Sequence, residues 1–136
     1  MREGKTENRK GARAALLIAH GSRRNAANLD LVALADALRD RAVYPIVEIA
    51  YLELAKPTIV EGGLACVEQG ADRVFLLPYF LSAGAHVTDD LERFRRELAD
   101  QFSHVRFILC KPLSLHPLLV DIVVDRLAEA EHAQSG

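Results

Sequence analysis

Two histidines end two segments of similar pattern. His20 follows the apolar run 14–19 and precedes a glycine and a serine, and His86 follows the apolar run 73–81 and the small residues 82–85. Each segment predicts a buried strand, then a turn of small residues, then a helix. Carboxyl ends of parallel strands meet at one edge of an α/β sheet, where such folds bind ligands. The pattern therefore predicts two imidazoles at one ligand-binding edge.

Imidazole is a common metal ligand and also a base that works near neutral pH. Glu53 follows the second apolar run and would add one carboxylate to His20 and His86. Such a site has fewer ligands than a structural metal site, and an underfilled site suits an enzyme that holds a metal briefly or keeps a position open. The structural alternatives are two histidines that only donate hydrogen bonds at strand ends, and a surface carboxylate at Glu53 unless the second strand ends beside the first.

Charged side chains flank both histidines. Arg23 and Arg24 either begin a helix or bind an anionic ligand beside His20. Asp89 and Asp90 either stabilise a helix start capped by Thr88 or orient the imidazole of His86. The remaining histidines give less indication of a function. His104 and His132 are expected at the surface, and His116 is expected beside a helix start.

The sequence partly matches a second motif, and one residue argues against that motif. His20-Gly21 with Asn25 is similar to part of the signature of histidine phosphatases, in which the histidine accepts the phosphoryl group. Ala19 stands where that signature has its phosphate-binding arginine. Phosphoryl transfer at His20 is therefore not expected.

Four apolar runs alternate with four helical patterns, which predicts a parallel sheet with helices on both faces. The expected strands are 14–19, 45–50, 73–78 and 105–110. The expected helices begin near Asn25 or Asn28, at Pro57, at Thr88 and at Leu115, and the last ends near Glu131. The common strand order 2-1-3-4 reverses between the first and third strands, which are the strands that carry His20 and His86.

Composition limits the class of protein. A chain of 136 residues predicts one domain, expected over 13–131, between a disordered arm over 1–12 and a frayed tail over 132–136. A net charge of −2 argues against nucleic-acid binding, and no apolar run has the length of a membrane span. Cys66 and Cys110 read as buried free thiols of a cytoplasmic protein.

Three elements together resemble a known family. They are Ala-His-Gly-Ser-Arg at 19–23, the segment 44–49 followed by Leu-Glu-Leu-Ala-Lys-Pro-Thr-Ile at 52–59, and Pro-Tyr-Phe-Leu-Ser-Ala-Gly-Ala-His-Val-Thr-Asp-Asp-Leu at 78–91. In this order they are similar to the sirohydrochlorin cobaltochelatases and ferrochelatases of the CbiX/SirB type, in their short single-domain form. The resemblance runs from about residue 14 to 128.

The resemblance implies a chelatase-like three-layer α/β sandwich with a four-stranded parallel sheet. It implies insertion of a divalent metal, Co²⁺ foremost with Fe²⁺ or Ni²⁺ as alternatives, into sirohydrochlorin during cobalamin or siroheme synthesis. The metal is a substrate, and no organic cofactor is expected. His20 and His86 match the catalytic histidines of the family, and Glu53 matches a carboxylate that would contact the metal with them.

The tetrapyrrole itself adds two expectations. It is a broad plate rich in carboxylates, so it needs cationic and N–H partners, and one small domain offers only one wall of a cleft. We therefore expect a homodimer. The candidate substrate-binding residues are Ser22, Arg23, Arg24, Lys56, Ser82 and Gly84. A non-catalytic tetrapyrrole or metal carrier with the same fold is the alternative function, and a hydrolase that uses metal-bound water is disfavoured because a third strong ligand is missing.

Overall fold

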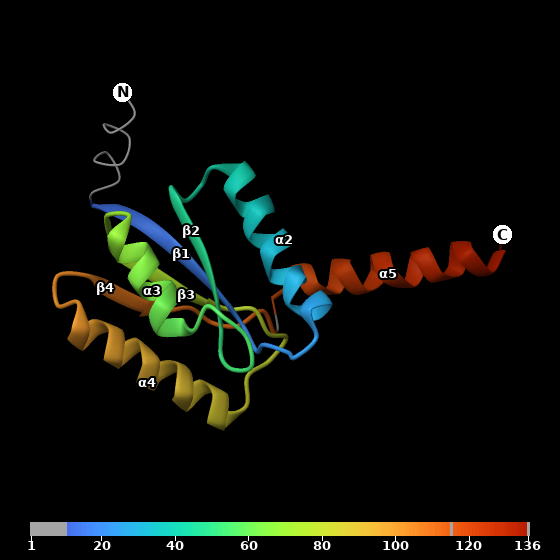
Figure 1. The fold of residues 1–136 in the computed structure, drawn as a ribbon. Coiled ribbons are helices and arrows are strands. Elements are labelled where there is room, and N and C mark those ends of the chain that lie inside the picture. The colour runs from blue at the N-terminus through green and yellow to red at the C-terminus, as the bar shows by residue number, and fades with distance from the viewer. Residues whose placement is uncertain (1–10, 115, 136) are drawn as a thin grey trace.

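A computed structural model describes residues 11–114 and 116–135. Its four parallel strands lie in the order β2-β1-β3-β4, as the sequence predicted (Figure 1). The expected arm falls mostly on residues 1–10, which lie outside the described residues, and Ala12 already belongs to the first strand. The elements are β1 (Ala12–Ala19), α2 (Asn25–Arg41), β2 (Ile46–Tyr51), α3 (Ile59–Glu68), β3 (Ala71–Pro78), α4 (Ala85–Gln101), β4 (Arg106–Leu109) and α5 (Leu118–Ser135).

The sheet separates two apolar cores, and the central strand β1 contributes to both. Leu16 and Ile18 pack toward α3 and α4, while Leu17 packs toward α2. This alternation follows from the strand geometry, which points successive side chains to opposite faces. Helices therefore lie on both faces of the sheet, which confirms the predicted three-layer class.

α3 begins two residues after the predicted start. Pro57, expected in the first turn, lies before the helix, and Thr58 caps it: the Thr58 hydroxyl accepts from the Glu61 N–H, and the Glu61 carboxylate accepts from the Thr58 N–H. This reciprocal pair satisfies backbone donors that the first turn leaves open. At the other end Gly70 has φ +100°, as expected for a residue just past a helix.

α4 begins earlier than predicted, and the cap assigned to Thr88 is wrong. Gly84 precedes the helix, and the Thr88 N–H donates to the Gly84 carbonyl within the first turn. Val87 packs against the core, which favours a helix that already includes this residue. His86 consequently lies in the first turn of α4, and Asp89 and Asp90 lie beyond it.

α2 begins at Asn25, near the predicted start, but its cap differs from the prediction. Arg24 occupies the cap position and makes no side-chain capping bond, so neither Asn25 nor Asn28 caps the helix. Asn28 instead uses its side chain on the turn before the helix, as described below.

α5 continues to Ser135, through most of the region expected to fray, and it points away from the rest of the molecule (Figure 1). None of its residues is buried, and it makes no substantial packing contact with any other described element. Among the described residues, no helix combines the length and the hydropathy that crossing a membrane requires.

Candidate active site at the carboxyl edge of the sheet

Backbone hydrogen bonds join the segments that follow β1 and β2. The Leu52 N–H donates to the Ala19 carbonyl at 2.9 Å, and the Glu53 N–H donates to the His20 carbonyl at 3.0 Å. We expected Glu53 to be a surface carboxylate unless the second strand ended beside the first. β2 does end beside β1. Glu53 lies next to His20 at the edge where the sequence placed them.

Gly21 makes this contact possible. Its φ is +99°, and a Cβ built on it would lie 1.7 Å from the Glu53 carbonyl oxygen. Residues with a side chain are disfavoured at such a φ, and this Cβ would overlap the neighbouring backbone. Glycine at this position therefore fixes the spacing between the His20 and Glu53 segments.

The imidazole of His20 packs on the segment that follows β3. Its ring meets Phe80 edge to face, with the ring centroids 5.1 Å apart. The Tyr79 N–H donates to the Ile18 carbonyl, and the Phe80 carbonyl accepts from the Leu113 N–H of the segment after β4. His20 itself is exposed, so its ring is oriented by Phe80 and still open to a ligand.

Asn28 holds the turn that follows His20. Its Oδ1 accepts from the Ser22 N–H at 2.9 Å, and its Nδ2 donates to the Ser22 carbonyl at 2.8 Å. The Tyr51 hydroxyl donates to the Asn28 carbonyl at 2.6 Å, and burial raises the pKa of Tyr51, which keeps this donor protonated. Sequence reasoning considered Asn28 only as a cap, although an amide soon after a turn of small residues is a known means of bonding such a turn.

Ser22 is consequently occupied within the chain. Its N–H binds Asn28, and its hydroxyl accepts from the Arg24 N–H at 3.0 Å. The backbone amide of Ser22 was a candidate donor to substrate, but in this structure it already has a partner. The hydroxyl proton of Ser22 remains its one group for a ligand.

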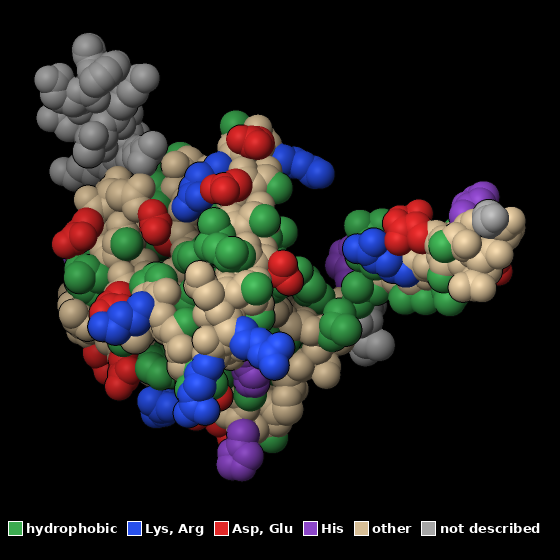
Figure 2. Space-filling model, turned by 45° about the vertical axis from the view of Figure 1, so that its right-hand side comes forward, with side chains coloured by type: hydrophobic (Ala, Val, Ile, Leu, Met, Phe, Trp, Pro, Cys, Tyr) green, Lys and Arg blue, Asp and Glu red, His purple; other side chains and the backbone are tan. Residues whose placement is uncertain are grey.

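A hollow of about 360 Å³ lies between α2 and the segment after β2. It brings together three of the predicted substrate-binding residues, namely Ser22, Arg23 and Lys56. Arg24, Ser82 and Gly84 do not line it. Figure 2 shows Lys and Arg side chains gathered beside histidine at the lower end of the body. The full lining is Ser22, Arg23, Asn25, Asn28, Leu29, Val32, Ile49, Tyr51, Leu54, Ala55 and Lys56.

His86 has fewer neighbours than His20. It is exposed, and no side-chain hydrogen bond involves it in the described part of the chain. Asp90, one of its two predicted orienting partners, instead forms an ion pair with Arg93 at 3.2 Å. Across residues 11–114 and 116–135, no three His, Cys, Asp or Glu side chains gather as a group that could hold a metal ion. Metal binding by His20, His86 and Glu53 thus stays a prediction.

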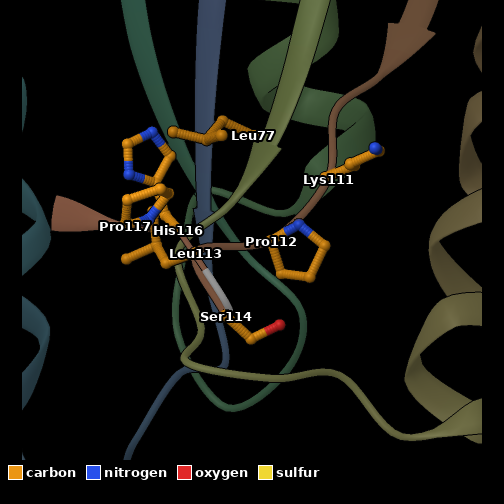
Figure 3. Close-up of a pocket in the computed structure, with 7 residues that line it drawn as sticks. All are labelled: Leu77, Lys111, Pro112, Leu113, Ser114, His116 and Pro117. Carbon is orange, nitrogen blue, oxygen red and sulfur yellow. The ribbon is translucent and has the colours of Figure 1, made fainter. Parts of the chain in front are cut away.

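A second hollow, of about 580 Å³, lies where β3 and β4 meet the start of α5 (Figure 3). His116 and Leu113 lie on one side of it and Lys111 on the other. The Nδ1 of His116 accepts from the Leu118 N–H at 3.1 Å, so His116 lies at the helix start as expected. Sequence reasoning missed Lys111, although its place directly after β4 puts it at the same edge as His20.

Neither cysteine is suited to bind a metal as a thiolate. Cys66 is buried, and burial together with the Glu48 carboxylate raises its pKa to about 12. Cys110 is only partly buried, and its pKa is also raised by burial. Both are free thiols, as expected, and both stay protonated near neutral pH.

Comparisons with known proteins agree with this fold. The model of the CbiX family matches residues 14–130. The chain is 39% identical to the chloroplastic sirohydrochlorin ferrochelatase of Arabidopsis thaliana over 112 residues, which are 82% of this chain and 50% of that protein. It is 31% identical to the sirohydrochlorin cobaltochelatase of Methanocaldococcus jannaschii, and the match covers 83% of this chain and 96% of that protein.

A solved structure is similar over the same region. The sirohydrochlorin chelatase SirB from Bacillus subtilis subspecies spizizenii, in complex with cobalt, superposes with a TM-score of 0.80 at 30% identity. The match covers 87% of this chain and 50% of SirB. The chain thus spans half the length of SirB and of the Arabidopsis protein.

Proposed function

The chain belongs to the CbiX family, and from this premise we propose that it is a metal chelatase that inserts a divalent cation into sirohydrochlorin. One observation supports this proposal most strongly. The exposed imidazole of His20 is held against Phe80 beside Glu53, and Arg23 and Lys56 line a hollow that adjoins the same turn. A base, a carboxylate and two cations thus lie at one edge of the sheet.

The reaction requires a base and a weakly held metal. The macrocycle loses two ring N–H protons and gains one dication. His20 accepts one of these protons, and His86 in the first turn of α4 accepts the other. A cation held by few protein ligands is easily transferred to the four ring nitrogens, which together bind it more strongly. Because neither histidine has a hydrogen-bond partner on its ring in the described chain, both nitrogens are open to protons and metal.

Binding of the substrate relies on its carboxylates. Arg23 offers a planar guanidinium that can bind a carboxylate through two hydrogen bonds, and Lys56 offers a compact charge on the other side of the hollow. Arg24, Ser82 and Gly84 are placed at the same edge and would meet other parts of a plate as broad as a tetrapyrrole. Binding should weaken as salt rises, because these cations are exposed.

Co²⁺ is the first candidate metal, followed by Fe²⁺ and Ni²⁺. The relatives are named for two different metals, a ferrochelatase in Arabidopsis and a cobaltochelatase in Methanocaldococcus. Imidazole and carboxylate ligands accept all three cations. The archaeal cobaltochelatase is matched over nearly its whole length, which supports cobalt as the first metal to test.

A single copy offers one wall of a cleft, and we propose that two copies form a homodimer. Both hollows open toward solvent at the carboxyl edge, and a twofold axis beside this edge would set a second wall opposite the first.

Anaerobic absorbance of sirohydrochlorin tests the proposal. The protein is mixed with the tetrapyrrole and Co²⁺, Fe²⁺ or Ni²⁺, and the rate of metal insertion is compared with the rate without protein. Acceleration supports the chelatase and ranks its metals. Tight tetrapyrrole binding without acceleration by any of the three metals contradicts the chelatase and supports the carrier.

A further inference from the structure

Leu54 combines two unfavourable features in one residue. Its φ is +65°, in the left-handed region, where a residue with a bulky side chain is strained. Its side chain is 52% exposed, and it belongs to neither of the two apolar cores of the described chain. Packing within this chain therefore does not account for a leucine at this position.

Ala42 provides a comparison, because among the described residues it is the other non-glycine residue with a positive φ. It follows α2 directly, and its N–H donates to the Arg39 carbonyl. A left-handed residue is a common way to end a helix. The conformation of Ala42 thus has a local structural reason, whereas Leu54 lies between β2 and α3 and follows no helix.

The loop that contains Leu54 is held on both sides of this residue. Before it, the Glu53 N–H donates to the His20 carbonyl, and after it, Ala55 packs against the core beneath α2. Figure 1 shows this loop, between β2 and α3, beside the turn that follows β1. An extended conformation at Leu54 would break one of these contacts. Its side chain therefore has a defined position at the carboxyl edge of the sheet.

The side chain of Leu54 lines the first hollow, of about 360 Å³, together with Arg23 and Lys56. Leu29 and Val32 of α2 add apolar surface to the same hollow. The hollow thus presents two cations beside an apolar wall. It is too small for a whole tetrapyrrole, but the edge of an apolar ring that carries a carboxylate arm has the chemistry to match both parts.

We propose that Leu54 is a substrate-binding residue, whose side chain contacts the apolar edge of the macrocycle where a carboxylate arm binds Arg23 and Lys56. The strain at Leu54 places an apolar side chain directly after Glu53, and strained residues of this kind cluster at ligand sites. The contact sets how far the ring edge enters the hollow, and therefore how the ring centre lies relative to His20. The inference rests on the proposed function for the identity of its substrate, and it concerns binding and not the insertion step.

Leu54 would contribute more to affinity than a leucine on a flexible loop. Contact with the ring removes exposed apolar surface from water, which favours binding. The strained conformation is already present in the free protein, so little further conformational freedom is lost when the ring binds. The two unfavourable features of Leu54 in the free chain thus both favour binding of an apolar ring edge.

Leu54→Asn tests the proposal in the full-length protein. Asparagine has nearly the shape of leucine, adopts the left-handed conformation more readily and is polar. We therefore expect the midpoint of urea denaturation to equal or exceed that of the wild type. The Kd for sirohydrochlorin, from an anaerobic absorbance titration without metal, should rise roughly 3–10-fold, because the variant loses part of the burial of a leucine.

Two variants serve as matched controls. Leu54→Met keeps an apolar side chain of similar volume and should bind sirohydrochlorin within about twofold of the wild type. Ala42→Asn introduces asparagine at the other left-handed position, which precedes β2 at the opposite edge of the sheet, and it should leave the affinity unchanged. Equal losses of affinity in Leu54→Asn and Leu54→Met would overturn the proposal, because polarity would then not be the cause.

Salt separates this contact from the electrostatic part of the hollow. The loss of affinity in Leu54→Asn should persist at high salt, because salt does not screen an apolar contact. The loss in Arg23→Gln should shrink as salt rises. A loss in Leu54→Asn that disappears at high salt would contradict an apolar contact with the ring.

Two other outcomes would assign Leu54 a different role. A urea midpoint of Leu54→Asn well below that of the wild type would mean that the leucine side chain stabilises the fold. A change of molar mass in light scattering, with unchanged affinity for sirohydrochlorin, would mean that Leu54 lies between copies of the chain. Either outcome overturns the proposal.

The titration also separates this inference from the proposed function. A wild type that binds sirohydrochlorin without accelerating metal insertion contradicts the proposed function, and a weaker Leu54→Asn would then still support the binding role of Leu54. A wild type that accelerates insertion, with a Leu54→Asn variant of unchanged Kd and KM, contradicts the inference alone.

Discussion

The two glycines that flank the two candidate histidines differ sharply. A Cβ on Gly21 would lie 1.7 Å from the Glu53 carbonyl, whereas a Cβ on Gly84 would meet nothing within 4 Å. The segment after β1 is held by the backbone of Glu53 and by the side chain of Asn28. The segment between Phe80 and Gly84 has no such support, and Leu81 within it is 68% exposed.

The difference suggests that the two histidine segments have different roles at the site. His20 lies on a turn whose position is set before substrate arrives, and a base that is already positioned needs little reorganisation. His86 lies at the exposed start of α4, next to a segment with room for a bulky ligand. A plate as large as a tetrapyrrole would therefore be positioned against the His20 side and enclosed from the His86 side.

Gly21→Ala should have the largest effect of any single change that leaves the histidines intact. The new Cβ would overlap the Glu53 backbone at a φ that alanine disfavours, so we expect a loss of roughly 2–5 kcal/mol in the free energy of unfolding. The midpoint of urea denaturation measures it. At temperatures where the variant is still folded, metal insertion should also be slower, because His20 and Glu53 are forced apart.

Gly84→Ala is the matched control for this change. Gly84 precedes α4 at φ −72°, a conformation open to alanine, so the loss should stay below about 1 kcal/mol. Equal losses for the two alanine variants would contradict the difference between the two segments.

Asn28→Ala should have the next largest effect. It removes both hydrogen bonds to the Ser22 backbone, which corresponds to about 1–3 kcal/mol of stability. The turn would then be less well defined, and kcat for metal insertion should fall more than sirohydrochlorin affinity does. Asn25 lines the same hollow, and its side chain makes no hydrogen bond, so Asn25→Ala serves as the control. A large effect of Asn25→Ala with none from Asn28→Ala would assign the hollow, and not the turn, to catalysis.

Arg23→Gln should have the smallest effect, and it acts on binding. Losing one exposed cation from the hollow should raise KM for sirohydrochlorin roughly 3–10-fold at low salt and less at high salt. Arg24→Gln changes the same charge one residue away, outside the hollow, and should change KM less. If both variants raise KM equally, binding depends on overall charge and not on this hollow.

The sequence predicted the elements that depend on apolar periodicity. β1 to β4 followed from four apolar runs, because strands buried on both faces leave a clear pattern. Their order was predicted only as the common order of small doubly wound sheets, and the structure has this order. Helix starts were less predictable. The start of α4 depends on Val87 packing into the core, a tertiary contact that the polar residues Thr88, Asp89 and Asp90 obscured.

At the site, residue types were easier to predict than their contacts. His20 and Glu53 were selected because they follow neighbouring strands, and the structure places their segments side by side. The partners of Ser22 could not be predicted, since the hydrogen bonds from Asn28 depend on how α2 leaves the turn. The exposure of α5 was also hidden, because an apolar helix has the same sequence pattern whether it packs within its own chain or on another.

The rate of metal insertion by histidine variants tests the central claim most directly. Wild type, His20→Ala, His86→Ala and His104→Ala are compared anaerobically with sirohydrochlorin and Co²⁺, and tetrapyrrole binding is measured separately. We expect His20→Ala to lower kcat by about 10²-fold or more with affinity little changed, because an oriented base is lost. His86→Ala should also lower kcat, and His104→Ala, which follows α4 at the opposite edge of the sheet, should not. A His20→Ala variant that inserts the metal at the wild-type rate would contradict the assignment of this edge as the active site.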